Sequence, residues 1–157
     1  MEKPKVIILR GCSGSGKSTY IKTHLPLSRV CSADHFFMED NKYVFVPEKL
    51  NLAHATCINK FLELLDAFVE VGTDLAFFVI DNTNISVADI APYVALASAY
   101  GLEHEIVTLD CPPELATNVH GVPPAKVRAQ YKYMKMQEKQ FPRYWNHTIL
   151  KYEDYRK

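Results

Sequence analysis

The sequence predicts an α/β fold in a single domain, with a parallel sheet of about five strands that helices cover on both faces. Three observations predict this fold class. Short apolar runs alternate with longer segments whose apolar residues recur at helical spacing. A glycine-rich segment directly follows the first apolar run. The length of 157 residues is about that of one domain and is sufficient to bury a core.

The elements of the first half follow from periodicity and from residues that begin or end helices. The continuous apolar run 75–80 is typical of a strand that is buried on both faces. Pro47 suits the first turn of a long helix, and Gly72 ends that helix. Its apolar residues at helical spacing are Leu50, Cys57, Ile58, Phe61, Leu65 and Phe68. We expect strands at 5–10, 29–32 and 75–80 and helices at 17–24 and 47–71.

The second half continues the alternation. Ser86 is expected to cap the start of the next helix, with Asp89 at the capping-box position, and Gly101 is expected to end that helix. Pro112 opens a short helix, which the segment 121–124 breaks. We expect strands at 105–109 and 148–150, and a helix that follows the break and reaches about residue 139.

Residues 11–18 read Gly-Cys-Ser-Gly-Ser-Gly-Lys-Ser and fill every fixed position of the P-loop pattern G-x-x-x-x-G-K-[ST]. The motif lies between the first strand and the first helix, which is the context its chemistry needs. Glycines let the backbone curl so that several N–H groups point at one anion, and the helix adds its positive dipole end. The sequence therefore predicts a P-loop NTPase fold that binds a nucleoside triphosphate.

The P-loop pattern also assigns roles to its side chains. Lys17 is expected to reach the β- and γ-phosphates of ATP, and the Ser18 hydroxyl is expected to ligate Mg²⁺. The residues expected to bind ATP are Gly11, Cys12, Ser13, Gly14, Ser15, Gly16, Lys17, Ser18 and Thr19.

Two acidic residues follow predicted strands at the edge of the sheet where the phosphates are expected. Asp81 follows the apolar run 75–80, where a Walker-B carboxylate holds Mg²⁺ directly or through water. Asp34 follows the strand 29–32, where a carboxylate can accept a proton from an attacking hydroxyl or orient it. An exposed loop acid or a helix N-cap is the alternative interpretation of Asp34.

Polar residues near these acids are candidates for substrate contact. Asn82 and Asn84 can contact substrate, although turn chemistry alone also explains them. His120 lies in the segment 118–123, which has the position of a lid between two helices; we define the lid region as residues 112–128. His54 lies on the apolar stripe of the long helix and is interpreted as a core histidine. The residues expected near the acceptor are His35, Asn82, Asn84, His120 and Lys126.

The charge of the chain is balanced but unevenly distributed. Residues 33–120 carry three Lys or Arg against fourteen Asp or Glu, whereas residues 121–157 carry nine against three. The basic segment also contains aromatic residues, including Tyr144 and Trp145, and Lys132, Lys135 and Lys139 recur at helical spacing. Cations and stacking rings together favour single-stranded nucleic acid as a partner. A solvated helix face is the alternative explanation.

Composition indicates the compartment and excludes several classes of protein. The N-terminus does not resemble a signal peptide, and no apolar run approaches the length of a membrane span. The four cysteines show neither C-x-x-C spacing nor a paired framework, so we expect neither a zinc site nor a disulfide scaffold. We expect Cys31 and Cys57 to be buried thiols and the compartment to be a reducing cytoplasm.

Together, these segments resemble the polynucleotide-kinase-like P-loop family, which includes the kinase half of bacteriophage polynucleotide 5′-kinase and the kinase-like domains of Nedd-ligase-binding proteins. The resemblance covers nearly the whole chain. It rests on G-C-S-G-S-G-K-S-T from Gly11, C-S-A-D-H-F-F from Cys31, the pair Ala53-His54, V-I-D-N-T-N from Val79, P-Y-V-A-L-A from Pro92 and N-V-H-G-V-P from Asn118. The resemblance implies that Asp34 is the general base, that the P-loop and Lys17 hold ATP, and that a lid arginine stabilises the transferring phosphoryl group.

The chain departs from the family pattern at two positions. Thr117 stands where the family has arginine directly before N-x-H-G, so the lid cation either comes from elsewhere, with Lys126 and Arg128 as the candidates, or is missing. Phe37 stands where the phage enzyme has an arginine that contacts substrate phosphate. These departures leave the phosphotransfer residues in place. They weaken the inference that the acceptor is the nucleic-acid end on which the phage enzyme acts.

We therefore expect an ATP-dependent kinase that transfers the γ-phosphate to a hydroxyl group, first of all on nucleic acid. The acceptor is then the 5′-hydroxyl end of DNA or RNA, or the hydroxymethyl group of a modified base such as 5-hydroxymethyluracil. Two alternatives stay open. One is a small-molecule kinase for a sugar, nucleoside or antibiotic, and the other is a nucleotide-binding interaction module with little catalysis.

Overall fold

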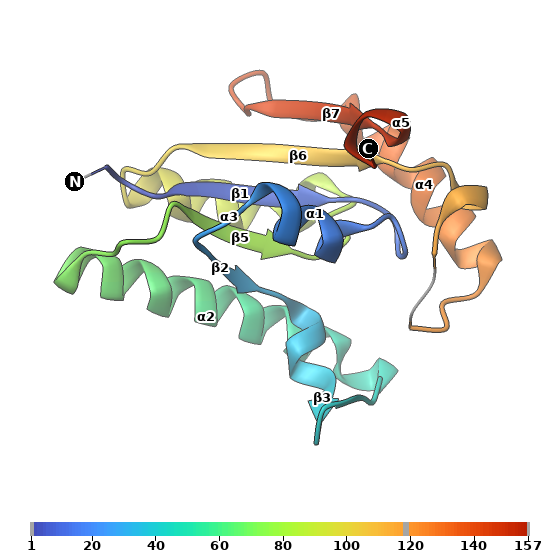
Figure 1. Ribbon diagram of the computed structural model, residues 1–157, viewed down its shortest axis with the longest axis horizontal. Coiled ribbons are helices and arrows are strands. Elements are labelled where there is room, and N and C mark those ends of the chain that lie inside the picture. The colour runs from blue at the N-terminus through green and yellow to red at the C-terminus, as the bar shows by residue number, and fades with distance from the viewer. Residues whose placement is uncertain (1, 118–119, 157) are drawn as a thin grey trace.

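A computed structural model describes residues 2–117 and 120–156 of the chain (Figure 1). Its main sheet has five parallel strands in the order β2-β5-β1-β6-β7. The strands are β1 (Lys5–Arg10), β2 (Ser28–Cys31), β5 (Phe77–Asp81), β6 (His104–Asp110) and β7 (His147–Lys151). The helices are α1 (Lys17–His24), α2 (Leu50–Val71), α3 (Val87–Ala99), α4 (Pro124–Glu138) and α5 (Tyr152–Tyr155).

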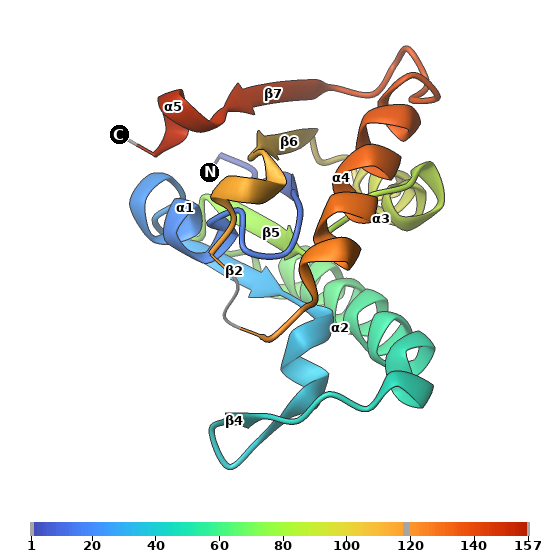
Figure 2. The ribbon, with the colours of Figure 1, turned by 90° about the vertical axis from the view of Figure 1, so that its right-hand side faces the viewer.

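Helices cover both faces of the sheet, as the sequence predicts, and Figure 2 shows α1 and α5 on one side and α2 and α3 on the other. Alternate side chains of β1 pack on opposite faces of the sheet. Ile8 packs into the core beneath α2 and α3, whereas Ile7 and Leu9 pack with residues of α1 and α5. The central strands β1 and β5 are therefore continuously apolar over residues 6–9 and 77–80, which is the pattern of a parallel sheet buried on both faces. Within the described residues, no helix is long and apolar enough to span a bilayer.

Most predicted elements are confirmed, with shifted boundaries. Strand β5 begins at Phe77 rather than at 75, because its ladder with β1 starts where Lys5 pairs with Phe77. The expected helix 47–71 begins with a 3₁₀ turn at Pro47–Lys49, and its Leu50 is 39% exposed rather than in the core. The capping box of Ser86 and Asp89 is present, and Cys31 and Cys57 are buried thiols.

The sequence prediction missed a hairpin between β2 and α2. It joins β3 (Met38–Glu39) to β4 (Lys42–Tyr43) and follows a 3₁₀ turn at Ala33–Phe37. Asp40 and Asn41 form its two-residue loop with φ of 49° and 64°. Two successive positive φ values are characteristic of a type I′ turn, which Asp and Asn tolerate. Strands of two residues carry no detectable periodicity, which is why the hairpin was missed.

Arg10, the last residue of the central strand β1, is fully buried and joins three elements at the carboxyl end of the sheet. All five of its N–H groups have acceptors in neighbouring elements. The acceptors are the carbonyls of Asn84 (2.8 Å), Ile85 (2.8 Å) and Met134 (2.7 Å), the Glu138 carboxylate (2.9 Å) and the Thr108 hydroxyl (3.2 Å). The guanidinium thereby holds the loop after β5 and the C-terminal part of α4 against the residue that precedes the P-loop.

Replacing Arg10 by Met is expected to lower the free energy of unfolding by about 3–5 kcal/mol, because it leaves the Glu138 carboxylate and three carbonyls without their donor. Urea denaturation of the purified protein measures the effect. The exposed Arg143 is the matched control, and Arg143→Met is expected to change stability by no more than about 0.5 kcal/mol. Equal effects of the two substitutions would show that the buried network does not stabilise the fold.

Candidate active site

The P-loop connects β1 to α1 at the carboxyl edge of the sheet and closes on its own lysine. The Lys17 ammonium group donates hydrogen bonds to the carbonyls of Gly11 (3.1 Å) and Cys12 (3.2 Å). Gly16 precedes α1 with φ of 94°, a conformation in which a side chain is strained. Ser18 and Thr19 follow in the first turn of α1 and are exposed. The loop therefore has the curled form that the pattern predicts.

Contacts from distant segments hold the backbone of the P-loop in place. They are Gly11 N–H to the Thr83 carbonyl (3.1 Å), Ser13 N–H to Gln130 Oε1 (3.0 Å), Thr117 N–H to the Gly14 carbonyl (2.8 Å) and the Tyr155 hydroxyl to the Ser15 carbonyl (2.9 Å). Ser15 is buried, and the described residues give its hydroxyl no hydrogen-bond partner. The loop is thus preorganised before any ligand binds.

Cys12 contributes its backbone to the P-loop, while its side chain belongs to the core. The thiol is fully buried against Val127 and Met134 of α4. Burial raises the pKa of the Cys12 thiol to about 11, so it stays protonated and unreactive at neutral pH.

Asp81 lies at the end of β5, next to the P-loop strand, and shares an electrostatic environment with Lys17. Burial raises the pKa of the Asp81 carboxyl, and the positive charge of Lys17 opposes that rise. Burial likewise lowers the pKa of Lys17, and Asp81 is the charge that counteracts it most. The described residues offer the Asp81 carboxylate no hydrogen-bond donor, and they contain no cluster of three or more His, Cys, Asp or Glu that could hold a metal ion.

Asp34 and His120, which the sequence places in separate motifs, are brought together. Asp34 lies just beyond β2, and its Oδ2 is 3.8 Å from Nε2 of His120. The Asp34 side chain is 54% exposed, as an acid that meets a substrate must be. Charges near Asp34 also affect the pKa of Asp81: Asp34 itself raises it, and the exposed His35 and His120 lower it. Asn118 and Val119, the start of the same motif, lie outside the described residues.

Asn82 and Asn84, which are expected near the acceptor, are both buried. Asn82 Oδ1 accepts a hydrogen bond from Ala33 N–H (2.8 Å), which fastens the segment that carries Asp34 to the end of β5. Asn84 Nδ2 donates to the carbonyl of Leu9 (2.7 Å), and its φ of 49° reverses the chain. Both side chains hold strand ends and loops, as turn chemistry predicts, and contact with substrate stays a prediction.

The two candidates for the missing lid cation lie on different sides of α4, and both are exposed. Lys126 precedes Gln130 by one turn, and Gln130 contacts the P-loop. Arg128 precedes Tyr131 by three residues, and Tyr131 donates to Asp110 at the end of β6 (2.7 Å). Both candidates therefore stand one turn before an α4 residue that lies near the P-loop, because Tyr131 also packs with the cluster that contains Cys12.

The basic aromatic segment is less open than the sequence predicted. Lys135 pairs with Asp110 at 2.8 Å. Burial would raise the pKa of Asp110, but hydrogen bonds from Lys135 and Tyr131 lower it. Trp145 is only 7% exposed and packs on Phe141 in the core, whereas Tyr144 is exposed. Lys135 and Trp145 are therefore structural, and the predicted continuous binding stripe is wrong at these two positions.

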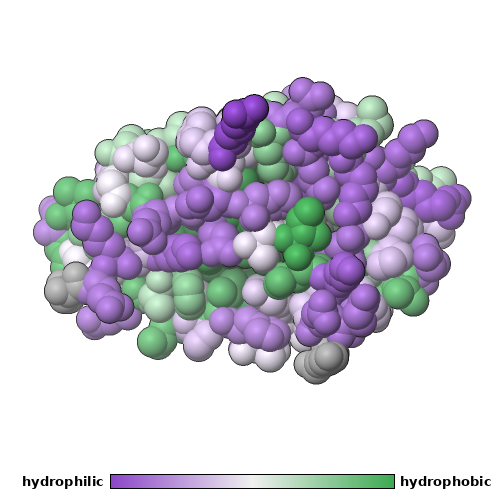
Figure 3. All heavy atoms as spheres, turned by 90° about the horizontal axis from the view of Figure 1, so that it is seen from above, coloured by the Kyte–Doolittle hydropathy of each residue, from purple (hydrophilic) through white to green (hydrophobic). Residues whose placement is uncertain are grey.

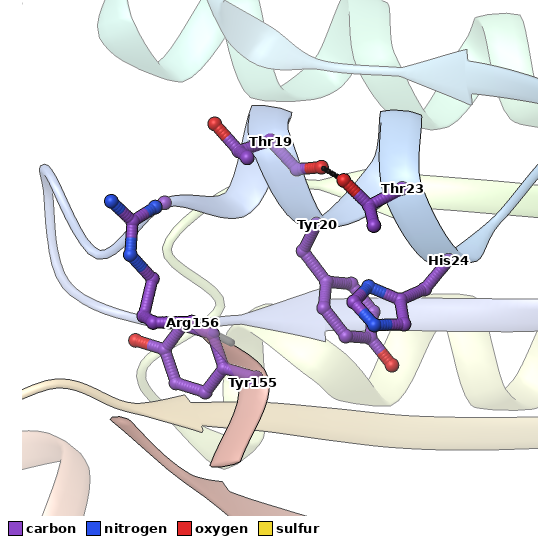
Figure 4. Close-up of a pocket in the computed structure, with 7 residues that line it drawn as sticks. Thr19, Tyr20, Thr23, His24, Tyr155 and Arg156 are labelled. Atoms are coloured by element: carbon purple, nitrogen blue, oxygen red, sulfur yellow. Dashed lines mark hydrogen bonds between the residues drawn. The ribbon is translucent and has the colours of Figure 1, made fainter. Parts of the chain in front are cut away.

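A small cavity of about 180 Å³ opens beside the P-loop, between α1 and the C-terminal residues (Figure 4). Its lining residues are Gly16, Thr19, Tyr20, Thr23, His24, Tyr155 and Arg156. The Tyr20 and His24 rings stack with centroids 4.5 Å apart, and Figure 4 shows Arg156 at the P-loop end of the cavity. Sequence reasoning missed Tyr155 and Arg156, because no motif marks them, just as it missed Arg10, Gln130 and Tyr43.

Gly14 makes the closest backbone approach in the site. It has φ of 80°, and an added Cβ would lie 2.6 Å from the carbonyl oxygen of Thr117. Gly121 has a similar φ of 69°, but nothing lies within 4 Å of its added Cβ. Gly14→Ala is therefore expected to destabilise the fold by at least about 1 kcal/mol more than Gly121→Ala, because only Gly14→Ala adds a clash to the backbone strain. Thermal or urea unfolding checks the difference, and equal losses would contradict the contact.

Three comparisons with known proteins agree with this geometry. Human NEDD4-binding protein 2 is 30% identical over 131 residues, which are 78% of this chain and 7% of that protein. A chain of the Pnkp1/Rnl/Hen1 complex has a TM-score of 0.55 and 23% identity, over 78% of this chain and 42% of that chain. A sugar kinase from Janibacter sp. HTCC2649 has a TM-score of 0.55 and 15% identity, over 98% of this chain and 87% of that chain. The chain thus spans a small part of the human relative and less than half of the Pnkp1 complex chain.

The fold of these neighbours is a kinase-like P-loop fold. The sequence also matches the AAA domain family over residues 6–141, which include the P-loop, Asp34 and Asp81. The resemblance to polynucleotide-kinase-like P-loop proteins is confirmed. The chain belongs to the AAA domain family of P-loop proteins.

Proposed function

We propose that this protein is an ATP-dependent kinase that transfers the γ-phosphate to a hydroxyl group. The observation that carries the proposal is the arrangement of Lys17, Asp81 and Asp34 at the carboxyl ends of adjacent strands. Strand β1 leads into the P-loop, β5 beside it ends in Asp81, and β2 beside β5 leads to Asp34. A triphosphate on the P-loop thus has a Mg²⁺ ligand and an exposed acid on one side.

The P-loop backbone and Lys17 would hold the phosphates of the donor. The free N–H groups at the start of α1 and the Lys17 ammonium group supply the positive field. Ser18 and Asp81 fit Mg²⁺, because both offer oxygen and the described residues give the Asp81 carboxylate no competing donor. The metal would supply neutralisation of the charge on the β- and γ-phosphates. Two protein ligands suffice, since Mg²⁺ at such sites keeps water and phosphate oxygens.

The cavity beside α1 is our candidate for the nucleoside part of ATP. It shares Gly16 with the P-loop and borders α5, which follows β7, the edge strand opposite β2. Its stacked Tyr20 and His24 rings offer an apolar surface, and Thr19, Thr23 and Arg156 offer polar groups to a nucleoside. The donor would then enter from the β7 side and the acceptor from the β2 side.

Asp34 is our candidate for the general base. As the acceptor oxygen forms its bond to the γ-phosphorus, its O–H bond breaks and the proton moves to the Asp34 carboxylate. The bond from the γ-phosphorus to the β–γ bridging oxygen breaks, and its electron pair leaves with ADP. Lys126 and Arg128 are our two candidates for the cation that stabilises the phosphoryl group, because their helix lies against the P-loop through Gln130 and Tyr131.

Nucleic acid is our first proposal for the acceptor, as a 5′-hydroxyl end or the hydroxymethyl group of a modified base. The basic segment 121–157 supports it, since nine Lys or Arg stand there against three Asp or Glu. The molecular face above β7, at the end of that segment, is largely hydrophilic (Figure 3). The Pnkp1 complex chain and NEDD4-binding protein 2 are similar to this chain, which adds support.

A small-molecule kinase is the second candidate, and one observation favours it. The hairpin next to Asp34 carries the exposed acids Glu39 and Asp40 near its turn, which would repel a polyanion but not a neutral metabolite. The sugar kinase from Janibacter shares the fold over nearly the whole chain.

Transfer of labelled γ-phosphate tests the proposed reaction. We expect wild-type protein with Mg²⁺ to phosphorylate one member of a panel of 5′-hydroxyl oligonucleotides, hydroxymethylated duplexes, sugars and nucleosides. Asp34→Asn is expected to keep ATP binding and to lower the turnover by about 10² or more, as the loss of a general base implies. Lys17→Ala is the control that abolishes turnover through the donor. ATP binding without transfer to any acceptor would favour an interaction module, and less than a threefold loss in Asp34→Asn would show that Asp34 is not the base.

Salt dependence separates the two acceptor classes. If nucleic acid is the acceptor, contacts from Lys132 and Lys139 release counterions, and the acceptor KM is expected to rise steeply with KCl. A double replacement of these exposed lysines by Gln is expected to raise the acceptor KM and to leave the ATP KM within about twofold, because it avoids both the structural Lys135 and the candidate cations Lys126 and Arg128. An acceptor KM that responds neither to salt nor to the replacements would support a small-molecule kinase.

A further inference from the structure

The two carboxylate oxygens of Asp34 have different neighbours. The Tyr43 hydroxyl donates a hydrogen bond to Oδ1 at 3.3 Å, whereas Oδ2 faces Nε2 of His120 at 3.8 Å. The Tyr43 and His120 rings are themselves in contact, with centroids 4.1 Å apart and planes tilted by 39°. Three segments far apart in the sequence therefore meet at one acid.

The β3–β4 hairpin places Tyr43 beside Asp34. The type I′ turn at Asp40 and Asn41 sets the register in which Met38 pairs with Tyr43. The hairpin is fastened to the domain through Phe37, which is buried in the core and whose carbonyl accepts a hydrogen bond from Val44 N–H (2.8 Å). The Tyr43 ring packs edge-on against Phe37, with centroids 6.1 Å apart. The position of Tyr43 thus depends on a local turn and on one buried anchor.

We propose that Tyr43 is a positioning residue of the acceptor site, whose hydroxyl fixes Oδ1 of Asp34 while its ring packs against His120, so that Oδ2 receives the proton of the acceptor. This inference rests on the proposed kinase function and adds a residue that no sequence motif contains. Tyr43 undergoes no net chemical change in the step, because the acceptor proton ends on Oδ2 and the electron pair of the broken phosphate bond ends on ADP.

The physical need for such a residue follows from the exposure of Asp34. A half-exposed carboxylate that no donor holds can turn about its Cβ–Cγ bond, and a base is effective only when one oxygen is aimed at the proton. Tyr43 can act as that donor because a tyrosine hydroxyl is protonated at neutral pH, and burial and the neighbouring Asp34 charge raise the pKa of Tyr43 further, to about 12. Its ring also forms part of the wall that an acceptor beside Asp34 would meet.

Tyr43→Phe and a matched control test the role in catalysis. Tyr100→Phe is the control, because Tyr100 also donates to a carboxylate, that of Asp66, but lies at the C-terminal end of α3 beside Gly101. Tyr43→Phe is expected to lower kcat by about three- to tenfold, the loss of one hydrogen bond, with the ATP KM and the melting temperature unchanged. Tyr43→Ala is expected to raise the acceptor KM as well, since the wall is removed. Wild-type kcat in Tyr43→Phe, or an equal loss in Tyr100→Phe, would overturn the proposal.

A second measurement keeps this test independent of the kinase assignment. In protein labelled with carboxyl-¹³C aspartate, the Asp34 resonance is assigned by its loss in Asp34→Asn. It is expected to shift at neutral pH in Tyr43→Phe and to stay in place in Tyr100→Phe. Absence of phosphate transfer by the wild type would defeat the proposed function, whereas an unmoved Asp34 resonance in Tyr43→Phe would defeat the role of Tyr43.

Discussion

A fully buried guanidinium group must find an acceptor for every N–H group, and Arg10 satisfies this demand with groups from three different elements. The carbonyls of Asn84 and Ile85 bring in the loop after β5, and the Met134 carbonyl and Glu138 bring in α4. Because Arg10 directly precedes Gly11, the P-loop begins from a fixed point. The side chain of one strand residue thus sets the distance between the P-loop, the Asp81 loop and the helix that carries Lys126.

Secondary contacts extend this constraint to the individual functional groups. Gln130 on α4 reaches the P-loop amide of Ser13, and Asn84 holds the carbonyl of Leu9 next to Arg10. Asn82 then fastens the backbone of Ala33, so that Asp34 is placed from the end of β5. The positions of Lys17, Asp81 and Asp34 are therefore linked through backbone and amide hydrogen bonds, which supports a site that is preorganised for phosphate.

The sequence predicted the parts of this structure that depend on local chemistry. The P-loop, the continuous apolar strands and the Ser86 capping box each have a short signature, and all three are present. The roles of Arg10 and Trp145 had no such signature, because a charged strand residue and a ring near the C-terminus become buried only through long-range packing. The hydrogen bond from Asn84 to the Leu9 carbonyl likewise had no signature, because the two residues are far apart in the sequence. Tyr43 was missed because its strand has two residues. The acceptor side of the site is therefore the part that sequence patterns describe least.

The central claim is that a triphosphate on the P-loop presents its γ-phosphate to Asp34. A crystal structure with Mg²⁺ and a non-hydrolysable ATP analogue tests it most directly. The account predicts phosphates on the amides of residues 14–19, the metal between Ser18 and Asp81, and the γ-phosphate between Lys17 and Asp34, with room for one acceptor oxygen in line with the bridging bond. A triphosphate bound away from the P-loop, or a γ-phosphate turned away from Asp34 toward β7, would contradict it.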